Sequence, residues 1–122
     1  MAGKSSIPRP VLKPRLRITC GKKIAFGPGK MELLAALVET GSLQAAARRL
    51  DMSYMRAWTL VQTMNECFCR PVVVAERGGK TGGGMQVTDT GHRALALYRE
   101  MESAALKSTA GPWQRLQKLL RA

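Results

Sequence analysis

The sequence predicts a mainly α-helical domain with small β-hairpins, built as a winged helix-turn-helix with an additional long C-terminal helix. Three observations predict this fold class. Apolar residues recur at helical spacing in three successive segments between residues 28 and 69. Two apolar segments, the first of them β-branched, then flank a glycine-rich stretch, and a longer amphipathic segment follows from residue 88. The chain has 122 residues, which fits one domain.

Basic residues dominate the charge of the chain. Lys and Arg number 20 against eight Asp and Glu, so the formal net charge is +12. This excess predicts a polyanion as partner, with nucleic acid first and an anionic membrane surface second. No apolar run approaches the ~18 residues that cross a membrane. The first ten residues also lack the apolar core of a secretory signal. We therefore expect a cytoplasmic protein.

The N-terminal region divides into an arm and a hairpin. Residues 1–13 are rich in Pro, Ser and Lys, and we expect a flexible basic arm there. Apolar residues then alternate with polar ones around Gly21, which predicts a short β-hairpin. We expect the winged helix-turn-helix domain over 14–107, and a C-terminal tail with a short amphipathic helix over 108–122.

Cap residues mark the first two helices. Pro28 suits the first turn of a helix that Gly41 is predicted to end. Ser42 is predicted to cap a short second helix over 43–50, whose small alanines let another helix lie close.

The third helix, at about 53–69, is predicted to be the recognition helix of the pair. Ser53 caps it, and one buried stripe is formed by Ala57, Val61, Met64 and Phe68. Large and polar side chains occupy the outward face near its N-terminal end: Tyr54, Met55, Arg56, Trp58 and Thr59. The alternative is that Tyr54 and Trp58 lie at the edge of the core, as aromatic residues often do.

The glycine-rich stretch ERGGKTGGGMQV partly resembles a Walker A phosphate loop. That motif needs a glycine where Val74 stands, and a helix directly after the Lys-Thr pair. Three glycines follow Thr81 instead and disfavour a helix. The stretch therefore predicts a flexible wing between two strands, in which Arg77, Lys80 and Thr81 approach a sugar-phosphate backbone closely.

The C-terminal third is predicted to be helical. Thr88 or Asp89 can cap a long helix with one apolar side. The pair Gly111-Pro112 is predicted to interrupt the chain before a last amphipathic segment, 113–122.

Catalytic and metal sites are not predicted. The three cysteines, Cys20, Cys67 and Cys69, argue against a disulfide framework, and zinc sites more often place two residues between cysteines. A redox or metal role for Cys67 and Cys69 stays open. The only histidine is His92, and the acidic residues form no plausible pair. We therefore expect no enzyme, no cofactor and no metal.

Together these features predict a sequence-specific DNA-binding regulator. Its recognition helix would enter the major groove, and its wing at 77–84 would contact the adjacent backbone or minor groove. The alternative is a basic architectural or RNA-binding protein with little sequence preference. We expect Arg56→Ala to weaken operator binding more than bulk-DNA binding, and Lys80→Ala to weaken both alike.

Two segments, GSLQAAARRLDMSYMRAWTLVQTMNE and GGKTGGGMQVTDTG, resemble the DNA-binding half of molybdate-responsive, ModE-type transcription regulators. More distantly, they are similar to the LysR-type winged helix. The likeness covers about residues 15–106. It rests on Ser53-Tyr54-x-x-Ala57-Trp58, on Met64-Asn65, and on Val87-Thr88-x-x-Gly91. The resemblance implies a homodimeric repressor or activator that binds double-stranded DNA, with the dimer made by helices outside the helix-turn-helix.

The resemblance also implies which residues face DNA: Ser42, Gln44, Tyr54, Met55, Arg56, Trp58 and Thr59. With the cap residue Ser53 and the wing residues Arg77, Lys80 and Thr81, these are the candidate site. The family's oxyanion-binding part would begin about where the sequence ends at Ala122, and nothing after Gly111 resembles it. We therefore expect no molybdate site in this chain.

Overall fold

The computed structural model describes residues 8–76 and 84–121. Its helices in those ranges are α1 Pro28–Thr40, α2 Leu43–Arg49, α3 Tyr54–Cys67, α4 Asp89–Ser108 and α5 Ala110–Gln117. Its strands there are β1 Ile18–Cys20, β2 Lys23–Phe26, β3 Val73–Ala75 and β4 Met85–Val87. The strands pair as two antiparallel hairpins, β1 with β2 and β3 with β4. The predicted fold class is confirmed.

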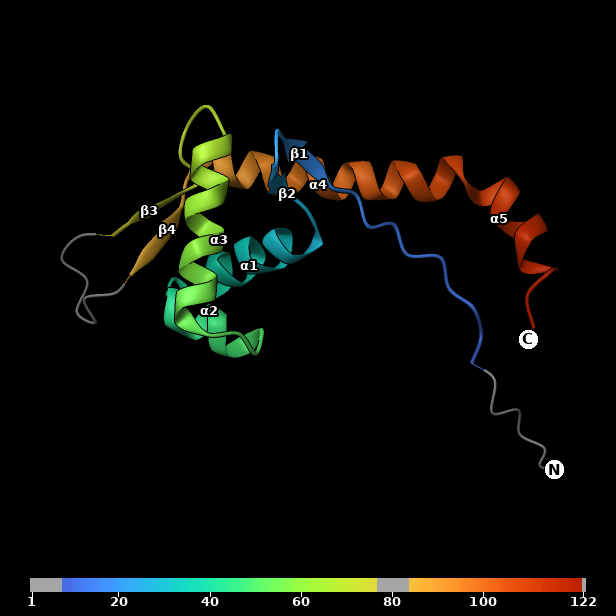
Figure 1. The fold of residues 1–122 in the computed structure, drawn as a ribbon, viewed down its shortest axis with the longest axis horizontal. Coiled ribbons are helices and arrows are strands. Elements are labelled where there is room, and N and C mark those ends of the chain that lie inside the picture. Colours follow the sequence, from blue (N-terminus) through green and yellow to red (C-terminus); the bar gives the residue numbers. More distant parts are fainter. Residues whose placement is uncertain (1–7, 77–83, 122) are drawn as a thin grey trace, which may run out of the picture.

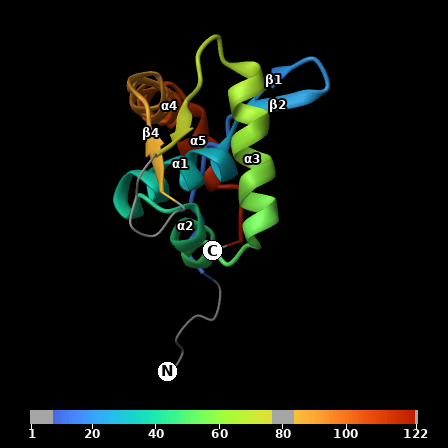
Figure 2. The ribbon, with the colours of Figure 1, turned by 90° about the vertical axis from the view of Figure 1, so that its left-hand side faces the viewer.

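The elements are unevenly distributed along the molecule. Helices α1, α2 and α3 gather with β3 and β4 at one end, and α4 runs from there to the opposite end, where α5 follows (Figure 1). From the side, α1 lies between α3 and β4, with the β1–β2 hairpin beyond α3 (Figure 2). Helix α1 contacts α2, α3, α4 and β4, so it is the hub of the packed end.

The core consists of apolar side chains from α1, α2, α3, α4, the strands and the segment before β3. The largest fully buried ones are Tyr98, Phe26, Leu33, Leu34, Leu37, Leu43, Met64, Val61 and Val72. Burying one such side chain contributes about 1.5–3 kcal/mol. Because Leu33, Leu34 and Leu37 recur at helical spacing, one face of α1 supplies the centre of this core.

The first hairpin is fixed to the helices by aromatic contacts. Gly21 has φ +64°, the left-handed region that glycine enters easily, and it turns the chain between β1 and β2. Phe26 packs edge-to-face on Tyr98 and on Phe68, with ring centroids 5.1 and 6.0 Å apart. The Tyr98 hydroxyl donates a hydrogen bond to the carbonyl oxygen of Leu16 at 2.6 Å. The segment before β1 is therefore tied to α4.

The long helix begins at a side-chain cap. Thr88 Oγ1 accepts a hydrogen bond from the Gly91 N–H at 3.1 Å, so Thr88 is the cap and Asp89 lies in the first turn. The same threonine donates its hydroxyl to the Pro71 carbonyl at 2.7 Å, and its N–H to the Val72 carbonyl at 3.0 Å. This cap therefore also fixes the start of α4 against the segment before β3.

The break after α4 lies earlier than predicted. The chain leaves helical geometry at Thr109, and Gly111 and Pro112 lie in the first turn of α5. The prediction that Gly111-Pro112 interrupts the chain is wrong, because a proline in a first turn lacks only an N–H that would have no helical partner. No helix in residues 8–76 and 84–121 is long and apolar enough to cross a membrane.

Candidate nucleic-acid interface

Helices α2 and α3 form a pair joined by a tight turn. Ser42 Oγ accepts a hydrogen bond from the Ala45 N–H, and Ser53 Oγ accepts one from the Arg56 N–H, at 3.2 and 3.0 Å. Between the helices, Asp51 has φ +56°, a left-handed conformation that Asp tolerates better than most residues. Both predicted caps are therefore present, and they set where each helix begins.

Helix α3 turns its large N-terminal side chains outward. Ala57, Val61 and Met64 are buried, as the stripe predicted, while Phe68 at the C-cap is only partly buried. Tyr54, Met55 and Trp58 are 48%, 66% and 42% exposed. Arg56 and Thr59 are also exposed, while Thr59 Oγ1 donates a hydrogen bond back to the Met55 carbonyl at 2.9 Å. Tyr54 and Trp58 thus each leave about half of their surface in solvent, at the edge of the packed part of α3.

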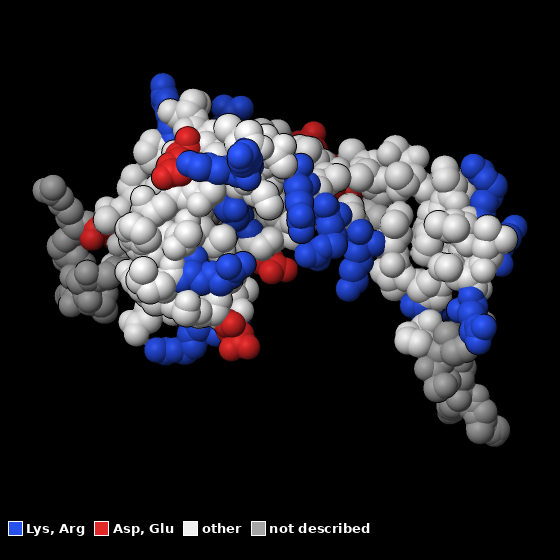
Figure 3. Space-filling model, in the orientation of Figure 1, with Lys and Arg blue, Asp and Glu red and all other residues white. Residues whose placement is uncertain are grey.

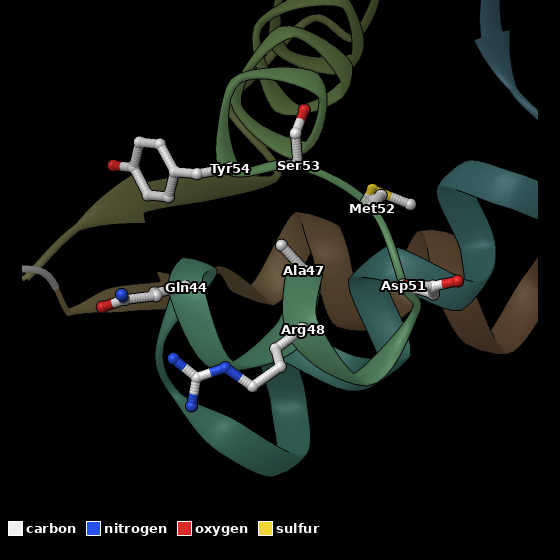
Figure 4. A pocket seen from close by; sticks show the side chains of 7 residues that line it. All are labelled: Gln44, Ala47, Arg48, Asp51, Met52, Ser53 and Tyr54. Carbon is white, nitrogen blue, oxygen red and sulfur yellow. The ribbon is translucent and has the colours of Figure 1, made fainter.

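A shallow concavity of about 450 Å³ separates α2 from the start of α3. Gln44 and Tyr54 project on the same side, toward the strands, and Arg48 extends below them (Figure 4). Sequence reasoning missed Arg48. The available signal was its spacing, because four residues from Gln44 place both side chains on one face of α2. The lining residues combine guanidinium, amide and phenol groups: Gln44, Ala47, Arg48, Asp51, Met52, Ser53 and Tyr54.

The base of the second hairpin is attached to the start of α2. The Met85 N–H donates a hydrogen bond to the Gly41 carbonyl at 3.1 Å, and half-buried Ser42 pairs with Gly84 in an isolated β-bridge. The hairpin therefore leaves the body beside the residues that cap and begin α2. The predicted wing residues Arg77, Lys80 and Thr81 lie outside the described residues.

Asn65 joins α3 to the same hairpin. Its side-chain oxygen accepts hydrogen bonds from the Val72 and Val73 N–H groups at 2.8 and 3.3 Å. Its side-chain nitrogen donates to the Val73 carbonyl at 3.0 Å. One amide therefore satisfies three backbone groups at the start of β3 and sets how that strand meets α3.

Asn65→Ala is expected to destabilise the protein by about 1–2 kcal/mol, because it leaves partly buried backbone groups without partners. Asn65→Asp is the comparison: it keeps an acceptor oxygen for the Val72 and Val73 N–H groups, but it replaces the donor to the Val73 carbonyl with a second oxygen. Because two of the three contacts remain, it should cost less. Urea unfolding followed by circular dichroism measures both. A stability of Asn65→Ala equal to that of the wild type would show that these contacts contribute nothing.

The acidic, histidine and cysteine side chains of the described residues are dispersed. Within residues 8–76 and 84–121, no three His, Cys, Asp or Glu side chains come together. All three cysteines are free thiols. Burial raises the pKa of the Cys67 thiol, and the neighbouring Cys20 thiol raises that pKa further. Cys67 is therefore held as the uncharged thiol rather than as a nucleophilic thiolate.

The sequence matches a known family of bacterial regulatory proteins and several curated relatives. The family described as "Bacterial regulatory helix-turn-helix protein, lysR family" matches residues 29–92. The chain is 44% identical over 82 residues to the molybdenum-pterin-binding protein MopB of Rhodobacter capsulatus, and 31% identical over 83 residues to the DNA-binding transcriptional dual regulator ModE of Escherichia coli. These matches cover 67% and 68% of this chain, but only 30% and 32% of the relatives.

Two solved structures share the fold. The structure titled CbnR_DBD-DNA complex aligns with a TM-score of 0.53 and 22% identity, covering 72% of this chain and 93% of that one. VV2_1132, a LysR family transcriptional regulator, aligns with a TM-score of 0.52 and 14% identity, covering 68% and 27%. At these identities the likeness concerns the fold alone.

Proposed function

Because the chain belongs to the LysR family of bacterial regulatory helix-turn-helix proteins, we propose that it is a sequence-specific, DNA-binding transcription regulator. The similar ModE protein of Escherichia coli is named as a DNA-binding transcriptional regulator. The chain spans about 30% of the length of the curated relatives it matches. For that reason only DNA binding and regulation are proposed, and no molybdenum chemistry.

The observation that carries the proposal is the outward face of α3. Tyr54, Met55 and Trp58 are large side chains exposed at the N-terminal end of that helix. A solvated helix face has no need of them, whereas a recognition helix uses such groups against base edges and thymine methyls in the major groove. Gln44 projects on the same side as Tyr54, and the hairpin base at Gly84 pairs with Ser42 at the start of α2. These residues would therefore lie near the DNA backbone that borders the groove.

We assign the DNA-contacting roles by position in the fold. Residues at the start of α3 would reach base edges, and those at the start of α2 would contact the adjacent phosphates. Ser53 Oγ accepts its capping bond, so its hydroxyl hydrogen is free to donate to a phosphate. The wing would contact the neighbouring backbone or minor groove. The assigned residues are Ser42, Gln44, Ser53, Tyr54, Met55, Arg56, Trp58 and Thr59, with Arg77, Lys80 and Thr81 from the wing.

The functional unit is proposed to be a homodimer formed through α4. Leu95 and Tyr98 of α4 face the core. On another side of the helix, Leu97, Met101, Ala104 and Ser108 recur at spacings of four, three and four residues, and all are exposed. We call these four residues the α4 stripe. Such spacing suits two helices that pack along one seam. A dimer in turn predicts a roughly palindromic operator.

Selection of bound sequences from a random duplex pool tests the regulator proposal. Wild-type protein is expected to enrich one motif. Arg56→Ala should then lose about 10- to 100-fold in affinity for the selected sequence, the value of one good base contact, and less on random duplex. Lys107→Ala, an exposed basic residue in the last turn of α4, is the charge-matched control and should leave the preference intact. No enriched motif would favour the architectural or RNA-binding alternative.

A further inference from the structure

A second concavity lies on the other side of α3, where the N-terminus of α1 meets the segment before β1. Its volume is about 280 Å³. Four of its lining residues are basic and none is acidic: Arg15, Arg17, Lys30 and Arg56. Figure 3 shows Lys and Arg side chains gathered across this part of the molecular surface. We call this feature the α1 concavity.

The helix end in the α1 concavity has no cap of its own. Gly27 occupies the N-cap position without a side chain, and the first turn contains no acidic residue. The first helical hydrogen bond runs from the Met31 N–H to the Gly27 carbonyl, and Pro28 has no N–H. The amide groups of Gly29 and Lys30 therefore lie at the positive end of a 13-residue helix without a side-chain acceptor. Such an end favours an anion.

Lys30 provides a second, independent observation that favours an anion-binding site. It is only 9% exposed, it lines the α1 concavity, and it forms no ion pair or side-chain hydrogen bond with another described residue. Within the described residues no buried side-chain nitrogen lacks a hydrogen-bond partner, so the Lys30 ammonium opens into the concavity, where an anion can reach it. Burial lowers the pKa of Lys30, and the positive charge of Arg56 lowers that pKa further. A bound anion would oppose both effects and stabilise the charged form.

The arginines of the N-terminal segment are held beside this lysine. The Tyr98 hydroxyl binds the Leu16 carbonyl at 2.6 Å, and Arg15 and Arg17 flank that residue in the chain. Both guanidinium side chains therefore start from a backbone position fixed on the protein core. A planar guanidinium matches the oxygens of a phosphate group, which two such residues can contact together.

We propose that the α1 concavity binds a phosphate group of the DNA backbone beside the recognition helix. The inference rests on the proposed function. Arg56, assigned above to base edges, only borders the concavity where it meets α3, about 200° around the helix from Tyr54 at ~100° per residue. The phosphate itself is assigned to Arg15, Arg17 and Lys30. With α3 in the major groove, the two phosphate backbones lie along its opposite flanks. The wing and the start of α2 would contact one backbone, and the α1 concavity would contact the other.

Salt dependence measures the contact directly. Lys30→Met and Arg17→Ala should each reduce the slope of log affinity against log salt by up to about 0.9, the value for one phosphate contact. The loss should be similar on the selected sequence and on random duplex, because a backbone contact carries no sequence information. Lys107→Met is the matched control and should keep the wild-type slope. Arg17 is exposed, so its variant is expected to fold even where Lys30→Met does not.

Gly27→Asp gives a test in which stability and binding move in opposite directions. A Cβ at Gly27 would be 3.6 Å from both Arg17 Cγ and the Leu16 carbonyl oxygen, so it has room. The new carboxylate would cap α1 and face the basic residues, raising the melting temperature. It would also occupy the place of the phosphate and repel the backbone, lowering DNA affinity. Gly27→Asn provides a cap without the charge and should weaken DNA binding less.

The outcomes separate the two proposals. Wild-type slopes for both Lys30→Met and Arg17→Ala would overturn the phosphate contact. A second result would also overturn it. If inorganic phosphate raises the melting temperature of the wild type but not of Lys30→Met, and both variants keep the wild-type salt slope on DNA, the site binds a free anion and not the DNA backbone. If the wild type enriches no sequence, the regulator proposal fails, and the salt slope on random duplex still decides whether the α1 concavity contacts DNA.

Discussion

Replacing Leu97 by glutamate is expected to convert the protein from a dimer to a monomer and to lower operator affinity by about 100-fold or more. Leu97 is 51% exposed on α4, and the neighbouring Met101 of the α4 stripe is 44% exposed. Two such helices packed along their stripes would remove these side chains from water. A carboxylate at Leu97 would have to be desolvated at that seam, and its counterpart in the second copy would repel it.

The large effect on DNA binding follows from linkage between two half-sites. When two recognition helices belong to one dimer, binding of the first helix to its half-site holds the second helix near the other half-site. The second helix then binds at a high effective concentration, which raises the overall affinity. A monomer loses that advantage while each recognition helix stays intact. Sedimentation velocity measures the oligomeric state, and titration of the selected duplex measures the affinity.

Leu119→Glu is the matched control for this prediction. Leu119 is 81% exposed beyond the end of α5, so the same change of leucine to glutamate occurs there without touching the α4 stripe. It should leave the dimer and the operator affinity intact. A Leu97→Glu protein that sediments as a dimer would refute the proposed interface. A monomer with unchanged operator affinity would refute the linkage of dimerisation to DNA binding.

The features that the sequence predicted are those that depend on near neighbours. Ser42 and Ser53 are caps because of residues three positions further on, and the outward face of α3 follows from its own periodicity. Thr88 and Asp89 were equal candidates for the cap of α4. The hydrogen bond from the Gly91 N–H identifies Thr88 as the cap, and the contact of Thr88 with Pro71, 17 residues earlier, holds it in place. Local patterns therefore predicted the elements and the orientation of the recognition helix.

Lys30 shows what local reasoning missed. In the sequence it is one of many basic residues near the N-terminus. Its spacing of three, four and seven residues from Leu33, Leu34 and Leu37 places it on the apolar face of α1. That position was a usable signal that the side chain is buried. That Arg15 and Arg17 join it could not be predicted, because this depends on the contact of Leu16 with Tyr98, 82 residues later.

Gly91 is a second residue whose role comes from a distant part of the chain. It lies in the first turn of α4, where the helix crosses the segment before β3. A Cβ at Gly91 would collide with the carbonyl oxygen of Val72 and would lie 2.6 Å from Val87 Cγ1. The Val72 carbonyl already accepts a hydrogen bond from the Thr88 N–H at 3.0 Å. Because the obstructing atom is backbone, it cannot rotate away as a flexible side chain would.

Gly91→Ala is therefore expected to destabilise the protein by about 3 kcal/mol, the upper end of the usual cost of overpacking. The loss should exceed that of Asn65→Ala, because the start of α4, the hairpin and the segment before β3 must all shift. Urea unfolding measures it. Gly111→Ala is the control: Gly111 lies in the first turn of α5 with only Arg115 Nη1 near, at 4.0 Å, so alanine should leave stability unchanged or raise it. Equal stabilities of the two variants would show that the close crossing at Gly91 does not constrain the fold.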